Sequence, residues 1–149
     1  YPTNSSGAKS NGTLTLGSSG NRFKDLYLSG DITAASITIS GAITEDAVTL
    51  TGTSTTIDIS AATNFVHDLT GATTYTFSNP AATGNASSFT LKIIQDSTAR
   101  TITWPSTVDW AGGTAPTLTT TANGVDVFVF YTIDGGTIYY GFTAGQAMA

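Results

Sequence analysis

Short triplets in which one polar residue separates two apolar ones recur along the N-terminal part of the chain. They fall at residues 14–16, 26–28, 37–39, 48–50 and 57–59. Successive side chains of a strand point to opposite faces, so each triplet predicts a short strand with both apolar side chains on one face. Ser-Gly pairs follow the second and third triplets and predict turns between the strands.

Two of these triplets belong to an eleven-residue repeat. Residues 29–39 read SGDITAASITI, and residues 40–50 read SGAITEDAVTL. A unit with so few apolar side chains cannot enclose a core, so it must stack on its neighbours or intertwine with other copies of the chain. The pattern favours a repetitive β-shaft over residues 1–48, in which the apolar stripes of three chains meet on one axis. A meander within a single globular sheet is the alternative.

Longer alternating runs with aromatic residues follow from about residue 49. Residues 65–69 and 73–77 are separated by Gly71-Ala72 and predict a hairpin. Residues 89–95 are followed by a turn and by residues 100–104, which predict the returning strand of a second hairpin.

A third hairpin is predicted near the C-terminus. Residues 125–131 are apolar on both faces, which is typical of a central strand covered on both sides. Asp134-Gly135-Gly136 predicts the turn to the partner strand at 137–142. Short strands with frequent turn signals predict an antiparallel β-sandwich head of jelly-roll type over residues 49–149.

The composition supports an all-β fold and removes several classes of function. The chain has 15 aromatic residues, 30 Thr and 11 Ile among its 149 residues, which is unlike a disordered chain. Its net charge of −5 provides no cationic surface for nucleic acid or for an anionic membrane. It has no Cys and no apolar run long enough for a transmembrane helix. The first residue, Tyr1, and the lack of a signal-peptide pattern predict an excised or processed fragment.

The titratable residues give little support for catalysis. His67 is the single histidine and alternates with Phe65 and Leu69, so we expect a structural or interface residue. No Gly-x-Ser-x-Gly motif accompanies it. A glycosidase needs two carboxylates across a cleft, but most of the ten here sit in predicted turns, and Asp126 would stand alone in its strand. We therefore expect a non-enzymatic protein without cofactor or metal.

Carbohydrate binding is the more plausible chemistry, because aromatic rings stack on the apolar faces of sugars. The candidate residues are Trp110, with Asp109 beside it and Gly112-Gly113 after it, and the pair Tyr139 and Tyr140. Adjacent residues of a strand point to opposite faces, so one of these two tyrosines belongs to the core. A core position for Trp110, closing the end of the sandwich, is the alternative, as is an intersubunit contact for the exposed tyrosine.

Several stretches resemble a known family. Residues 16–30, LGSSGNRFKDLYLSG, resemble a shaft segment that is common in bacteriophage tail fibres just before a C-terminal head. Residues 89–95, 102–106, 110–116 and 124–128 resemble a C-terminal module of phage fibres, frequent also in phages of marine and aquatic bacteria. The resemblance covers roughly residues 12–145. It implies a parallel homotrimer on a virion with a distal, host-binding head, and it carries over no catalytic or binding residue. The His-x-His pattern with which some fibre tips hold a metal is missing.

These observations predict an intertwined all-β homotrimer that lies outside the cell, on a virion. We expect it to attach a phage to its bacterial host through a surface polysaccharide or another receptor. An N-terminal region beyond this sequence would join it to other virion proteins. A head fibre or capsid decoration, and a bacterial surface filament or adhesin subunit, are alternatives that the sequence leaves open.

Overall fold

The computed structural model describes residues 20, 26–29 and 32–148. The chain divides into two compact units, residues 1–41 and 42–149. The N-terminal unit holds most of the predicted shaft. The C-terminal unit holds the predicted head and begins seven residues before the predicted start at residue 49.

The described residues of the N-terminal unit form no strand. The predicted strand at 14–16 lies outside the described residues, and residues 26–28 and 37–39 form no strand in the single chain, so the three-chain shaft stays a prediction. Leu26, Leu28, Ile37 and Ile39 are each more than half exposed. The physical reason is that a strand needs a hydrogen-bonded neighbour, which these short segments of one chain do not supply to each other.

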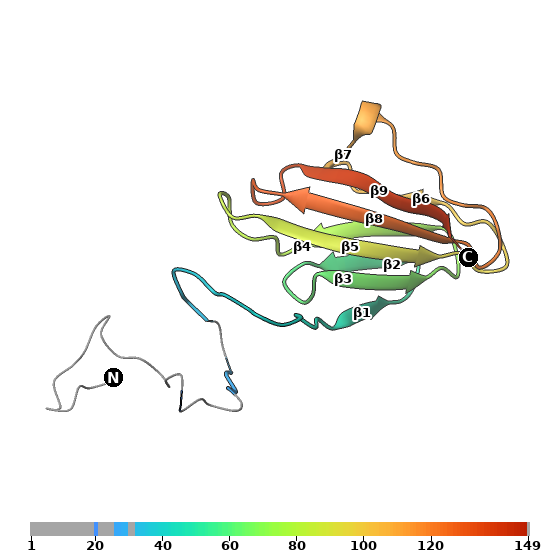
Figure 1. The fold of residues 1–149 in the computed structure, drawn as a ribbon. Helices are drawn as coiled ribbons and strands as arrows, with labels where there is room; N and C mark the ends of the chain where they lie inside the picture. Colours follow the sequence, from blue (N-terminus) through green and yellow to red (C-terminus); the bar gives the residue numbers. More distant parts are fainter. Residues whose placement is uncertain (1–19, 21–25, 30–31, 149) are drawn as a thin grey trace, which may run out of the picture. The chain divides into compact units, whose positions relative to one another are not determined.

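The C-terminal unit consists of nine strands and one 3₁₀ turn among the residues described (Figure 1). They are β1 (Ala47–Leu50), β2 (Ser54–Asp58), β3 (Asn64–Asp68), β4 (Thr73–Ser78), β5 (Ser87–Ile94), β6 (Ile102–Thr103), β7 (Val108–Trp110), η1 (Ala111–Gly113), β8 (Val125–Thr132) and β9 (Tyr139–Met148). The triplets at 48–50 and 57–59 coincide with β1 and with the end of β2, so the repeat runs into this unit. The all-β prediction is confirmed for this unit.

The strands form two sheets that face each other (Figure 1). One has six strands in the order β1-β3-β5-β8-β9-β7, and the other has three in the order β2-β4-β6. From β1 to β6 the chain therefore alternates between the sheets, and the neighbours within each sheet along this stretch are parallel. β5 with β8 and β8 with β9 are antiparallel.

Two of the three predicted hairpins are wrong. β3 and β4, at 65–69 and 73–77, lie in different sheets, as do β5 and β6 at 89–95 and 100–104. The alternation of apolar and polar residues specifies which side chains face inward. It fits two consecutive strands in facing sheets as well as it fits a hairpin. The connections are long enough to cross the roughly 10 Å between packed sheets. The six-stranded sheet is therefore mixed and the three-stranded sheet is parallel, whereas the sequence predicted antiparallel sheets.

The C-terminal hairpin is confirmed. β8 and β9 are antiparallel, with Tyr131 opposite Tyr140. Gly135 and Gly136 adopt φ angles of 71° and 82°, which glycine accepts at little cost. The Asp134 carboxylate accepts hydrogen bonds from Thr132 Oγ1 at 2.9 Å and from the Ile138 N–H at 3.1 Å. The pKa of Asp134 is lowered, first by the backbone hydrogen bond from Ile138, so the ionised side chain fastens this turn.

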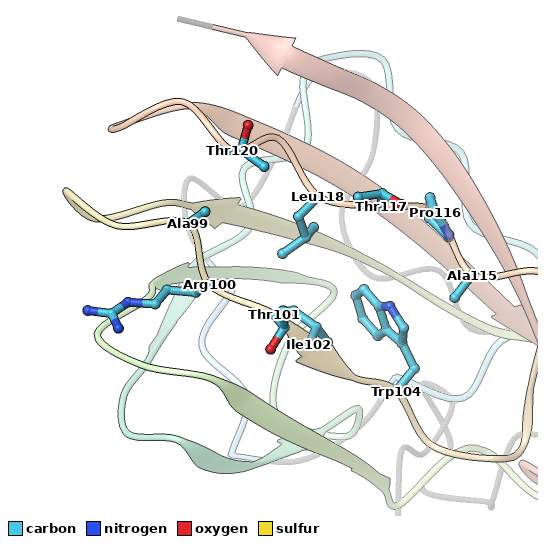
Figure 2. A pocket seen from close by; sticks show the side chains of 10 residues that line it. All are labelled: Ala99, Arg100, Thr101, Ile102, Trp104, Ala115, Pro116, Thr117, Leu118 and Thr120. Atoms are coloured by element: carbon cyan, nitrogen blue, oxygen red, sulfur yellow. The ribbon is translucent and has the colours of Figure 1, made fainter.

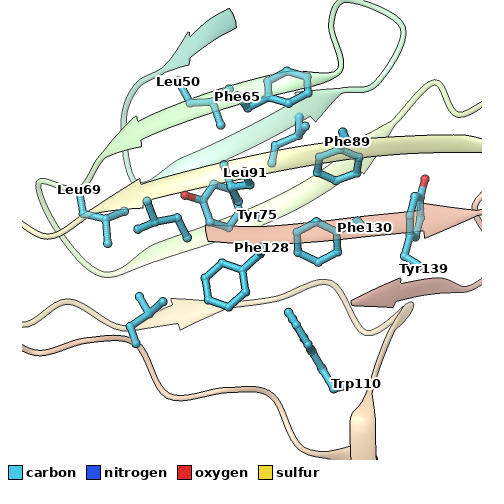
Figure 3. Close-up of a cluster of buried hydrophobic side chains, with 13 residues drawn as sticks. Leu50, Phe65, Leu69, Tyr75, Phe89, Leu91, Trp110, Phe128, Phe130 and Tyr139 are labelled. Carbon is cyan, nitrogen blue, oxygen red and sulfur yellow. The ribbon is translucent and has the colours of Figure 1, made fainter. Parts of the chain in front are cut away.

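The hydrophobic core lies between the two sheets (Figure 3). Ile57 and Tyr75 of the three-stranded sheet, and Leu91, Phe128 and Phe130 of the six-stranded sheet, are at most 1% exposed. The Phe89 and Phe130 rings stack with centroids 4.9 Å apart. The opposite face of β8, which carries valines, is half-buried in the single chain and so lacks the full cover that the sequence predicts.

Candidate functional site

The structure divides the four predicted ligand-binding residues into a buried and an exposed pair. Trp110 and Tyr139 are 8% and 3% exposed. The Trp110 ring centroid lies 5.2 Å from that of Trp104 and 5.9 Å from that of Phe128. Tyr139 packs edge-on against Phe77. Trp110 thus occupies the core position that was its alternative interpretation, although the residue also lines the surface hollows beside η1.

Asp109 and Tyr140 are both exposed and lie directly opposite each other on β7 and β9. They share a shallow hollow of about 390 Å³ with Gly112 and Gly113. The sequence named these residues as separate binding candidates, and the structure brings them together at the edge of the six-stranded sheet. The hollow belongs to an outer sheet face, because Tyr140 points away from the core that holds Tyr139.

A deeper groove lies elsewhere, between β6 and the segment 115–120 (Figure 2). Its volume is about 330 Å³, at the lower end of the range for small-molecule sites. Side chains of Ile102, Trp104, Pro116 and Leu118 form its apolar surface. We call this feature the Trp104 groove, and its rim carries three hydroxyls, from Thr101, Thr117 and Thr120.

One wall of the groove is fixed by a buried amide. Gln95, at the end of β5, is 2% exposed. Its Oε1 accepts a hydrogen bond from the Arg100 N–H at 2.9 Å, and its Nε2 donates to the Arg100 carbonyl at 3.2 Å. Gln95 therefore holds both the N–H and the carbonyl of Arg100. This positions the start of β6 and the β6 side chains that line the groove.

The Arg100 side chain on this wall is oriented by Asp96. Nε and Nη2 of Arg100 lie 3.0 and 2.7 Å from Oδ2 of Asp96. This side-chain hydrogen bond is the main reason why the pKa of Asp96 is lowered, followed by the Thr98 N–H. In Figure 2 the guanidinium points away from Trp104 and Leu118, so Arg100 contributes its backbone and the base of its side chain to the groove.

The opposite wall is fixed by a buried carboxylate. Asp126 of β8 is 1% exposed. Its Oδ2 accepts from the Thr119 N–H at 2.7 Å, and its Oδ1 accepts from Thr119 Oγ1 at 2.6 Å and from the Ala147 N–H at 3.2 Å. Asp126 therefore holds the segment that carries Leu118. Two buried polar groups therefore preorganise the groove from opposite sides.

His67 lies in the core and joins the two sheets. It is fully buried, and its Nδ1 lies 2.6 Å from the hydroxyl of Tyr75 on the facing sheet. Nε2 has no hydrogen-bond partner among the described residues. Burial lowers the pKa of His67, against smaller raising effects from the Gly52 backbone and the charge of Asp68. Burial also raises the pKa of Tyr75. The ring does not reach the Trp104 groove, whose lining it does not join.

Two further features bear on the predicted absence of metal and membrane chemistry. Within the described ranges, no three His, Asp or Glu side chains gather as a metal site. No helix among those same residues is long and apolar enough to cross a membrane.

Comparison with known proteins identifies no relative. No family model, curated protein or solved structure matches the chain. The groove and the exposed faces are therefore interpreted from their own geometry.

Trp104 was not among the binding residues predicted from the sequence. The structure leaves the ring half-buried, stacked on Tyr75 on one side and lining the groove on the other. Pro105 and Pro116 border the two walls of the groove. They are the sequence feature that could have pointed to it, since proline marks where a strand ends beside an irregular segment.

Proposed function

We propose that this chain is part of a homotrimeric virion fibre whose C-terminal unit binds a polysaccharide on a bacterial surface through the Trp104 groove. The carrying observation is the groove itself: an apolar and aromatic hollow with a rim of hydroxyls, held open by two buried polar groups. A site fixed in this way loses little conformational entropy when a ligand binds.

The lining suits a sugar better than an apolar ligand. Trp104, Ile102 and Pro116 provide the flat apolar contact that the hydrogen-bearing face of a pyranose requires. Thr101, Thr117 and Thr120 also line the groove, and their hydroxyls are donors and acceptors, as sugar hydroxyls are. The volume of about 330 Å³ accommodates one or two sugar rings of a longer polymer.

The homotrimer is supported by the N-terminal repeat. Apolar side chains recur there at eleven-residue spacing, and the described ones are exposed in a single chain, among them Ile32, Ile37 and Ile43. Exposed apolar side chains at a fixed period need partners with the same period, and other copies of the same chain provide them. A slender fibre that presents a binding head follows from this arrangement.

Filling the groove is expected to abolish polysaccharide binding. Ala115 is exposed at the groove, so Ala115→Leu places a branched side chain into it without entering the core. We expect binding at least about tenfold weaker on an array of bacterial surface polysaccharides, measured with the fluorescently labelled full chain.

Ala86→Leu is the matched control, because Ala86 is equally exposed and lies outside the groove. It should bind like the wild type. Equal loss in both variants, or none in either, would contradict the groove as the site. A wild-type chain that binds no polysaccharide on the array and no intact bacterial cell would instead favour a structural appendage without receptor binding.

A further inference from the structure

The six-stranded sheet has an apolar outer face over β8 and β9. Three cross-strand pairs lie there: Val125 with Met148, Val129 with Phe142, and Tyr131 with Tyr140. These six side chains, together with Val127 between them, are called the outer stripe. Met148 belongs to this face because its side chain covers Gly145, which pairs with the outward-facing Val127.

Three large side chains of the outer stripe remain exposed in the single chain. Tyr140 is 43% exposed, Phe142 55% and Met148 47%. An aromatic side chain has about 150–250 Å² to bury, so the two aromatic residues alone leave about 200 Å² of mostly apolar surface. With Met148 and the half-exposed valines, the stripe reaches the few hundred Å² that mark interaction surfaces.

The two borders of the outer stripe carry opposite charges. Lys92 of β5 lies opposite Val127 on one side, and Asp109 of β7 lies opposite Tyr140 on the other. The structure records no ion pair for either within the described part of the chain. A ring of copies brings one border of each stripe to the other border of its neighbour, so the charges are complementary in a cyclic assembly.

We infer that the outer stripe is the contact between C-terminal units of neighbouring copies of this chain, arranged head to tail around a symmetry axis. A second copy is the occupant that fits both the apolar surface and its oppositely charged borders. The inference takes the number of copies, three, from the proposed fibre, but it does not depend on the Trp104 groove, which has a different lining.

Thiol labelling tests the contact directly, because the chain contains no cysteine. Val127→Cys places a thiol of similar size in the middle of the outer stripe. Thr74→Cys places one on an exposed position of β4, on the other sheet. The full-length variants are labelled at low concentration and at a concentration where light scattering gives about three times the 15.2 kDa chain mass.

We expect assembly to slow labelling at position 127 at least tenfold and to leave position 74 unchanged. A double variant, Tyr140→Glu with Phe142→Glu, should remove this protection. Equal labelling at both positions in the trimer, or a wild-type mass of one chain at every concentration, would overturn the inference. Protection at position 127 without polysaccharide binding would contradict the proposed function and leave this contact standing.

Discussion

Replacing Trp110 with alanine is expected to lower the free energy of unfolding by about 3–5 kcal/mol, the usual cost of truncating a buried tryptophan. The ring is 8% exposed and packs against Trp104, Phe128 and Phe130. No described side chain stands ready to fill the space. Chemical denaturation followed by tryptophan fluorescence or circular dichroism measures the change.

The neighbouring residue provides the control. Asp109 is exposed, and Asp109→Ala should change the free energy of unfolding by less than about 0.5 kcal/mol. Gly141 offers a second test of the same packing, because a Cβ there would lie 2.7 Å from Cζ3 of Trp110. Gly141→Ala should therefore also destabilise the fold. A Trp110→Ala protein as stable as Asp109→Ala would contradict the core position of the ring.

This result matters for how binding experiments are interpreted. Sequence reasoning offered Trp110 as a receptor contact, so a Trp110→Ala variant that no longer binds cells would look like support for that role. With Trp110 in the core, the loss reports unfolding or distortion of the fold. Ala115→Leu avoids the problem because position 115 is exposed.

Acidification from above pH 6.5 is expected to destabilise the fold through His67. The pKa of His67 is lowered from 6.5 in the folded protein, chiefly by burial, while the unfolded chain keeps the ordinary value. Between the folded and unfolded pKa values the unfolded state binds the extra proton, so stability rises with pH there and is lost as pH falls. For one titrating group, the free energy of unfolding changes by at most ~1.4 kcal/mol per pH unit.

Denaturation midpoints at several pH values between 5 and 8 measure this slope, and His67→Asn is the matched variant. Asparagine cannot titrate, but it retains a polar partner for the Tyr75 hydroxyl. The His67→Asn protein should therefore be less stable than the wild type at pH 8, and its free energy of unfolding should hardly change between pH 5 and 8. The aspartates with lowered pKa values, Asp58, Asp96 and Asp134, lose their contribution below about pH 4, outside this window. A wild-type profile as flat as that of His67→Asn would contradict the assignment.

The sequence was a good guide to which side chains face the core. Phe65 and His67, Tyr75, Phe128 and Phe130 are all buried as their alternation predicts. It was a poor guide to strand neighbours, because alternation carries no information about which strand supplies the hydrogen bonds. Turn residues identify the neighbouring strand where they form a distinctive hairpin turn, as at Gly135-Gly136. They do not identify it where a short connection crosses between sheets.

The candidate site shows the same limit. Asp109 and Tyr140 were named as binding candidates from different segments, and the pairing of β7 with β9 that brings them together was not predicted. The Trp104 groove was missed because its walls are about fifteen residues apart in sequence and are placed by Gln95 and Asp126 from two other strands. Pro105 and Pro116 mark irregular chain beside the two walls, but no local pattern shows that these segments meet.

The alternation of strands between two sheets also has a consequence for how the chain folds. Parallel partners lie 17 residues apart for Ala47 with Asn64, 20 for Ser54 with Thr74 and 26 for Asn64 with Thr90. Closing loops of this size costs similar amounts of entropy, since the cost rises only with the logarithm of length. We expect the strands from β1 to β6 to add to the two sheets one after another as synthesis proceeds. Each strand would then pair with one that has already folded. The pairings of β5 with β8 and of β7 with β9 close the longest loops, 31 residues for Ile94 with Val125 and for Val108 with Tyr139, and should set the slow step.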